Sequence, residues 1–115
     1  MKDHLSYLRG HERAAVSDCV GRLRQILREQ LVGVWLFGSK ARGDFGPDSD
    51  IDLLIVIPEL DWSLWDEIRL TAARVSLEYD VLLNTHILDQ PRWRAQMRYQ
   101  DTLWREVQQD GVSLL

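Results

Sequence analysis

Cysteine and lysine are scarce in this sequence of 115 residues. Cys19 is the one cysteine, and 12 of the 14 basic residues are arginine. A single cysteine excludes both a disulfide within the chain and a zinc site built from several thiolates. Acidic residues number 18, so the formal net charge is −4. Duplex nucleic acid is usually bound by a clustered basic face, and this charge balance therefore argues against direct nucleic-acid binding.

Long hydrophobic runs are also missing. The longest unbroken apolar run covers residues 53–57, whereas a membrane-spanning helix needs roughly 18 such residues. The N-terminal segment MKDHLSYLRGHER has no apolar core of the kind that a signal peptide requires. We therefore expect a cytoplasmic protein that does not enter a membrane.

Length and composition favour one folded domain. The chain is 45% hydrophobic and 28% charged, with no low-complexity tract, which is the composition of an ordinary globular domain. We expect residues 1–115 to form a single domain with no room for a second, substrate-binding domain.

Hydrophobic periodicity predicts the elements of the first half of the chain. Apolar residues at helical spacing predict a helix over residues 12–30, and the β-branched and aromatic segment 32–37 predicts a strand. Gly38 and Ser39 then open a short helical turn. The apolar run 51–57 predicts a buried central strand, because strands covered on both faces are almost continuously hydrophobic.

The second half predicts two more helices with a strand between them. Asp61 can cap a helix, residues 79–83 predict a third short strand, and residues 90–109 predict a last helix. Strands two and three are joined by a helix and are therefore expected to be parallel, whereas the short connection between strands one and two allows an antiparallel pair. The expected fold class is α/β, with a small mixed β-sheet and flanking helices.

Gly38 and Ser39 form a candidate phosphate-binding turn at the end of the first strand. Glycine lets the backbone approach a ligand closely, and the free N–H groups at a helix start favour phosphate oxygens. Ser39 adds a hydroxyl donor.

Three aspartates are expected to meet at the same edge of the sheet. Asp50 and Asp52 are two residues apart at the start of a strand, so alternation places both on one face. Asp80 begins the predicted third strand, whose N-terminal end lies beside that of the second. Carboxylates so placed repel one another unless a cation binds, and Mg²⁺ is typically held by a few carboxylates and substrate phosphates. This arrangement predicts phosphoryl chemistry on a nucleoside triphosphate.

Residues 38–56 read GSKARGDFGPDSDIDLLIV, in which Gly38-Ser39 is followed after ten residues by Asp50 and Asp52. With a later aspartate opening a strand, this pattern resembles the DNA polymerase β-like nucleotidyltransferase superfamily. The form GSKARG…SDIDLLIV is similar to its minimal members, the MNT proteins. The resemblance covers residues 32–80, and the ending VQQDGVSLL is also similar.

The resemblance implies a polymerase β-like fold and a role for each motif residue. Asp50 and Asp52 would bind two Mg²⁺ ions, and Asp80 would bind the catalytic ion beside the attacking hydroxyl. Gly38 and Ser39 would hold the β- and γ-phosphates. An acceptor hydroxyl then attacks the α-phosphate, and pyrophosphate leaves.

Minimal proteins of this type resemble the antitoxin half of HEPN/MNT toxin–antitoxin pairs. The resemblance implies Mg²⁺-dependent transfer of AMP from ATP to a tyrosine of a HEPN ribonuclease toxin. Two alternatives remain open at this stage. One is an antitoxin that neutralises its toxin by binding alone, and the other is a nucleotidyltransferase acting on a small molecule.

Asp80 has a second interpretation, as an ordinary turn residue. In that case Glu78 or Asp61 would take its place in a different register.

Two basic residues follow the Gly38-Ser39 turn. Arg42 is expected either to contact a phosphate or to pair with Asp44 or Asp48, and Lys40 is expected to be solvated.

The histidines and two of the tryptophans offer no separate site. His4, His11 and His86 lack metal-ligand spacing and are expected to be surface or structural residues. Trp62 and Trp93 fall near the edges of their helical stripes, so one or both are candidate partner contacts.

Overall fold

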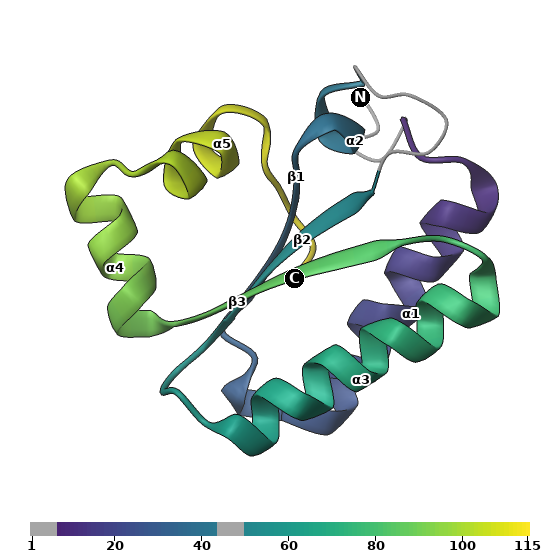
Figure 1. Cartoon of the computed structure of the whole chain (residues 1–115), viewed down its shortest axis with the longest axis horizontal. Coiled ribbons are helices and arrows are strands. Elements are labelled where there is room, and N and C mark those ends of the chain that lie inside the picture. Colours follow the sequence, from purple (N-terminus) through teal and green to yellow (C-terminus); the bar gives the residue numbers. More distant parts are fainter. Residues whose placement is uncertain (1–6, 44–49) are drawn as a thin grey trace.

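A four-stranded mixed sheet with helices on both faces forms the structure (Figure 1), a computed structural model that describes residues 7–43 and 50–115. The strand order is β3-β2-β1-β4. The first elements along the chain are α1 (Gly10–Leu27), the 3-10 turn η1 (Arg28–Gln30), β1 (Gly33–Phe37), α2 (Ser39–Arg42) and β2 (Ile51–Ile57). The remaining elements are α3 (Trp62–Tyr79), β3 (Leu83–Asp89), α4 (Gln90–Tyr99), α5 (Thr102–Asp110) and β4 (Val112–Ser113). The expected α/β class is confirmed.

The predicted pairing of the strands is also confirmed. β1 pairs with β2 in antiparallel fashion, and β2 pairs with β3 in parallel fashion. The helix α3 makes the crossover between the two parallel strands, as the sequence predicts. β2 therefore lies between β1, which leads into the Gly38-Ser39 turn, and β3.

Two layers of apolar side chains cover the faces of the sheet. The α1–α3 face is packed with odd-numbered residues of β2, such as Leu53 and Ile55, which are fully buried. The α4–α5 face is packed with Leu54 and Val56 and with Trp93 of α4. Figure 1 shows α1 and α3 on one side of the sheet and α4 and α5 on the other. Asp52 lies two residues before Leu54 in β2, so its side chain is on the same face of the sheet, the α4–α5 face.

The sequence locates the start of α3 well. Asp61 is its N-cap, and Asp61 Oδ1 accepts hydrogen bonds from the backbone N–H of Ser63 at 2.9 Å and of Leu64 at 3.3 Å. These bonds satisfy N–H groups that have no partner within the helix. Asp61 is therefore a helix cap rather than a site residue in place of Asp80.

The predicted third strand over residues 79–83 is wrong. Helix α3 continues through Tyr79, and Asp80 ends it with a left-handed backbone (φ 54°) whose N–H is bonded to the carbonyl of Ser76. Aspartate is one of the few residues that tolerate this conformation, which commonly ends a helix. The strand begins only at Leu83, so β3 carries Asn84 and His86 rather than Asp80.

The predicted last helix over residues 90–109 is two helices. Gln100 adopts a left-handed conformation (φ 49°) that ends α4, and Asp101 is the N-cap of α5. The chain then returns to the sheet as β4, which pairs with β1 through Trp35 and Leu36. None of the helices in the described residues is both long and apolar enough to cross a membrane.

Candidate active site

The predicted turn and the predicted carboxylate meet at one point of the sheet. Phe37, at the end of β1, is the Cα partner of Asp52 in β2. The next residue, Gly38, has φ +80°, and a Cβ atom on it would collide with Asp52 Oδ2. Only glycine fits here, because this conformation is strained for other residues and the carboxylate occupies the space of a side chain. The turn that opens α2 therefore lies directly against the Asp52 carboxylate.

Asp50 and Ser39 flank this contact. Asp50 immediately precedes β2 and is half-buried, and Ser39 is the first residue of α2 and is also half-buried. Ile51 between the two aspartates is fully buried, and its N–H donates to the carbonyl of Leu82 at 2.9 Å. Burial of the Ile51 side chain and this backbone bond fix the strand direction in which Asp50 and Asp52 alternate with it.

The prediction that Lys40 is solvated is wrong. Its side chain is 3% exposed, and Nζ forms an ion pair with Glu12 Oε2 at 2.8 Å. Burial would raise the pKa of Glu12, but the hydrogen bonds from Lys40 and from the Arg9 N–H outweigh it and hold the pKa below its ordinary value. The pair ties α2 to the start of α1, so Lys40 braces the turn rather than facing solvent.

Arg42, at the end of α2, is partly exposed and reaches toward the C-terminal helix. Its Nη1 atom lies 3.7 Å from Asp110 Oδ2 in α5. Asp44 and Asp48, its alternative partners by sequence, lie outside the described residues. The structure thus places Arg42 beside α2 with one carboxylate contact that the sequence analysis did not anticipate.

Asp52 has two partners that sequence reasoning missed. Asn84 is its Cα partner in β3, and Asn84 Nδ2 donates to Asp52 Oδ1 at 3.0 Å. His86 Nε2 lies 3.4 Å from the same oxygen and 3.3 Å from Asn84 Nδ2. A signal was present, since the polar residues Asn84 and His86 are two positions apart and therefore on one face of a strand, but it could be used only with the correct bounds of β3. We call Asp52, Asn84 and His86 the Asp52 cluster.

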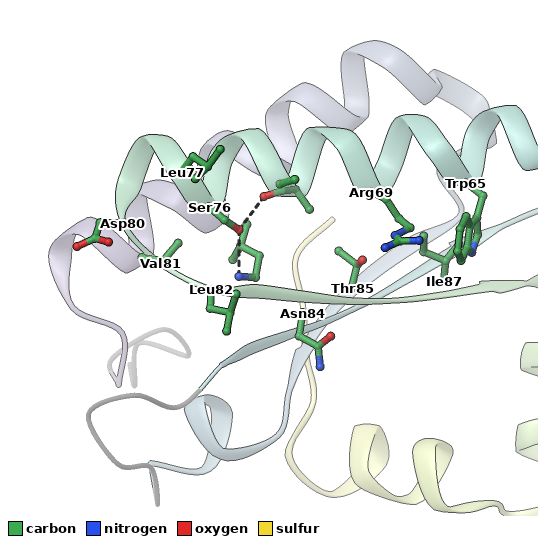
Figure 2. A pocket seen from close by; sticks show the side chains of 13 residues that line it. Trp65, Arg69, Ser76, Leu77, Asp80, Val81, Leu82, Asn84, Thr85 and Ile87 are labelled. Carbon is green, nitrogen blue, oxygen red and sulfur yellow. Dashed lines mark hydrogen bonds between the residues drawn. The ribbon is translucent and has the colours of Figure 1, made fainter.

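Asp80 does not join this cluster. It is exposed at the C-terminal end of α3, on the rim of a groove of about 780 Å³ between α3 and the outer edge of β3. Figure 2 shows Asp80 at the helix end and Asn84 on the side of β3 that faces away from α3. Within residues 7–43 and 50–115, no three His, Cys, Asp or Glu side chains form a group that could hold a metal ion. The expected group of three carboxylates is therefore absent from the described structure.

The residues that are present still fit a divalent cation. Mg²⁺ commonly binds to one or two carboxylates together with substrate phosphates, and amide oxygens are acceptable ligands for hard cations. Asp50 and Asp52 supply the carboxylates, and Asn84 supplies an amide at the position next to Asp52. The Asp52 side chain is 23% exposed, so an ion can reach it from solvent.

Of the two tryptophans expected as candidate partner contacts, one is exposed and one is buried. Trp62, at the start of α3, is 65% exposed, whereas Trp93 is buried and packs on Trp35 with ring centroids 5.6 Å apart. Trp62 also packs edge-on against Trp65, which lines the α3–β3 groove. The exposed tryptophan is therefore Trp62.

Known proteins resemble this chain in sequence. The chain matches the nucleotidyltransferase domain family over residues 20–103. A candidate protein adenylyltransferase of Methanocaldococcus jannaschii is 43% identical over 61 residues, which are 51% of this chain and 61% of that protein. A second candidate protein adenylyltransferase of the same organism is 29% identical over 101 residues, covering 88% of this chain and 95% of the relative.

Solved structures show the same fold. A candidate nucleotidyltransferase from Sulfolobus solfataricus superposes with a TM-score of 0.56 at 22% identity, covering 98% of this chain and 89% of the other. A toxin–antitoxin structure with AMP-PNP superposes with a TM-score of 0.55 at 22% identity, covering 86% and 72%. The glycine–serine turn against the Asp52 carboxylate, the mixed sheet and the family match over most of the chain agree, and the protein belongs to the nucleotidyltransferase domain family.

Proposed function

We propose that this protein is an antitoxin that transfers AMP from ATP to a tyrosine of a HEPN-type ribonuclease toxin. The observation that carries the proposal is the contact between Gly38 and Asp52. It puts a turn suited to phosphate oxygens next to a carboxylate suited to a cation, which is the juxtaposition that nucleotidyl transfer needs. Transfer to the toxin tyrosine would block its RNA cleavage.

The reaction is a substitution at the α-phosphorus of ATP. The tyrosine hydroxyl oxygen forms a bond to the α-phosphorus, and the bond from that phosphorus to the oxygen bridging to the β-phosphate breaks. Pyrophosphate leaves with the bonding electrons, and the hydroxyl proton passes to solvent. The product is a phosphodiester between AMP and the tyrosine side chain. A divalent cation, when bound, neutralises charge on the attacking and leaving oxygens.

The residues of the site divide these tasks. Gly38 and Ser39 hold the β- and γ-phosphates with backbone N–H groups and the serine hydroxyl, and Arg42 contributes a positive charge beside them. Asp50 and Asp52 hold the cation, with two Mg²⁺ ions as the occupancy implied by the resemblance. Asn84 takes the place on β3 for which Asp80 was predicted, since it is the residue next to Asp52.

The comparisons support two coarse parts of the proposal, namely nucleotidyl transfer to a protein and a place in a toxin–antitoxin system. The two relatives from M. jannaschii are candidate protein adenylyltransferases, and one neighbour is a toxin–antitoxin structure with AMP-PNP, an ATP analogue. Another, with a TM-score of 0.55, is a toxin–antitoxin variant in which two aspartates two positions apart are replaced by glutamate. The same spacing separates Asp50 and Asp52.

A second function is favoured by one specific observation. The position next to Asp52 on β3 is occupied by neutral Asn84, so the described site has one carboxylate fewer than the sequence predicts. An antitoxin that neutralises its toxin by binding alone would tolerate that loss. This alternative predicts that a chain lacking the Asp52 carboxylate protects cells as well as the wild type does.

Mass spectrometry of the co-expressed pair separates the two functions. The partner to test is the protein encoded by the neighbouring reading frame, incubated with this chain, ATP and Mg²⁺. The proposal predicts a partner heavier by one or more AMP groups, at a tyrosine, with the wild-type chain but not with Asp52→Asn. An unmodified partner that is nevertheless neutralised would contradict the proposal and favour neutralisation by binding.

A further inference from the structure

The polar atoms of the Asp52 cluster converge on one point of the α4–α5 face. Asp52 Oδ1, Asn84 Nδ2 and His86 Nε2 form a triangle with sides of 3.0, 3.3 and 3.4 Å. They come from two adjacent parallel strands, in which Asp52 pairs with Asn84, and Leu54 pairs with His86. The two backbones are hydrogen-bonded to each other, so the sheet itself sets the separation of these side chains.

The size of this triangle matches one face of a metal coordination shell. Octahedral ligands about 2.1 Å from an ion are about 3.0 Å from their nearest neighbours, because adjacent ligands subtend a right angle. The observed sides of 3.0 to 3.4 Å are close to that spacing. The amide of Asn84 carries an oxygen as well as a nitrogen, and a half-turn about its last torsion exchanges the two.

His86 is oriented before any ion arrives. Its ring packs edge-on against Phe37, with centroids 5.1 Å apart and an interplanar angle of 64°. Phe37 is 3% exposed and belongs to the core on the α4–α5 face, so it is a rigid support. The His86 side chain is itself 37% exposed. Nε2 is therefore directed at Asp52 while the site stays open to solvent.

The chemistry of this donor set differs from that of a group of carboxylates. Mg²⁺ prefers oxygen ligands, whereas imidazole nitrogen suits first-row transition metals, whose affinity for nitrogen sites exceeds that of Mg²⁺. Asn84 is neutral and supplies none of the negative charge that Mg²⁺ would use, and His86 adds a nitrogen donor. Both features favour a transition metal over Mg²⁺.

We propose that His86 Nε2 is a metal ligand together with Asp52, and that this site is selective for a divalent transition metal such as Mn²⁺ over Mg²⁺. The inference rests on the proposed function only in that both place a cation at Asp52. It assigns His86, which the sequence analysis treated as a surface or structural residue, to the metal site.

The test is a metal titration that does not depend on catalysis. Mn²⁺ is added alone to the purified full chain, and the free ion is counted by electron paramagnetic resonance, while Mg²⁺ is titrated by calorimetry. His86→Ala should weaken Mn²⁺ binding by at least about tenfold, as loss of ligand-shell groups generally does, and should leave Mg²⁺ binding within about twofold. Asn84→Asp should strengthen Mg²⁺ binding, because it adds a carboxylate next to Asp52. His11→Ala, at the start of α1, is the matched control.

Pulsed electron paramagnetic resonance gives a second readout. Mn²⁺ bound to the wild-type chain should show coupling to an imidazole nitrogen, and His86→Ala should lose that coupling while His11→Ala keeps it. Absence of nitrogen coupling in the wild type, or equal changes for the two ions in His86→Ala, would overturn the inference. If the chain transfers AMP but shows no nitrogen coupling, the proposed function stands and His86 is not a metal ligand. If the coupling is present but no AMP is transferred, His86 is a metal ligand and the proposed function is wrong.

Discussion

Two side-chain clusters, each built around an aspartate, show opposite designs in this protein. At the contact between α1 and α3, Arg22 is bonded to both Asp18 and Glu78, and the Tyr79 hydroxyl donates to Asp18 Oδ2 at 2.7 Å. In the Asp52 cluster, by contrast, the partners of the carboxylate are an amide and an imidazole. In the described part of the chain, no arginine or lysine forms an ion pair with Asp52.

The pKa shifts of the α1–α3 cluster reflect the hydrogen bonds between its side chains. Hydrogen bonds from Arg22, then from Tyr79, hold the pKa of Asp18 below its ordinary value. The hydrogen bonds that Arg22 donates to Glu78 and then to Asp18 raise the pKa of Arg22, and the bond to Asp18 raises the pKa of Tyr79. The α1–α3 cluster thus has its compensating cation built in, whereas we propose that a cation from solution compensates the charge of Asp52. On that proposal, the comparison separates structural carboxylates from functional ones.

The largest predicted effect comes from replacing the aspartate of each cluster by asparagine. Asp52→Asn should lower AMP transfer by about a thousandfold, which corresponds to about 4 kcal/mol of transition-state stabilisation, because the cation loses its ligand. Asp18→Asn should leave transfer within about twofold and instead lower the melting temperature. Initial rates and thermal unfolding of both variants provide the measurement. Equal losses of activity in the two variants would remove the distinction between the clusters.

A second prediction concerns the buried brace under the turn. Lys40→Met leaves Glu12 buried without its partner, and loss of one member of a buried ion pair costs about 3–5 kcal/mol. Urea unfolding should show this loss, and the double variant Glu12→Gln with Lys40→Met should recover part of it because no charge is then stranded. If Lys40→Met unfolds at the wild-type urea concentration, Lys40 is solvated after all, as the sequence suggested.

A third prediction tests the contact between the turn and the carboxylate. Gly38→Ala forces a side chain into a positive-φ conformation that is almost exclusive to glycine, and against Asp52 Oδ2. The conformational cost is about 1–3 kcal/mol before any displacement of the carboxylate. Nucleotide transfer should fall by more than stability does. Gly21→Ala is the matched control, since a Cβ there meets nothing within 4 Å and alanine favours a helix interior. The control should be as stable as the wild type or more stable.

The smallest predicted effect lies in the α1–α3 cluster. Its groups are at the surface, so Arg22→Leu should lower the melting temperature by less than about 4 °C and leave transfer unchanged. The lowered pKa of Asp18 means that its contribution to stability is present above the unfolded pKa of about 3.9 and disappears as the pH falls through the lower folded value. Thermal unfolding between neutral and acid pH should therefore show a shallower acid limb in Arg22→Leu. An acid limb as steep as that of the wild type would show that Arg22 does not hold the pKa of Asp18 down.

The sequence predicts the buried frame of the fold because burial leaves a direct pattern. The nearly continuous apolar run of β2 predicted its bounds of residues 51–57, and Asp61 marked the start of α3. The glycine–serine turn was also predictable, since glycine directly after a strand allows the backbone a close approach.

The sequence is a poor guide to β3 for a physical reason. Asn84 and His86 occupy its site-facing positions, so the strand lacks the apolar run that marks β2, while the short apolar segment before it is only the end of α3 and a turn. Lys40 illustrates a related limit. Its burial depends on Glu12, which is far away in the sequence and is brought near only by the packing of α1.

Calorimetry of AMP-PNP binding tests the central claim, namely that Asp52 next to the Gly38-Ser39 turn recruits a cation and a triphosphate together. The nucleotide analogue is titrated into the wild-type chain, Asp52→Asn and Asp18→Asn, each with and without a divalent cation. The account predicts saturable binding that requires the cation in the wild type and in Asp18→Asn, and that is lost in Asp52→Asn. Binding that is indifferent to the cation, or unchanged in Asp52→Asn, would contradict it.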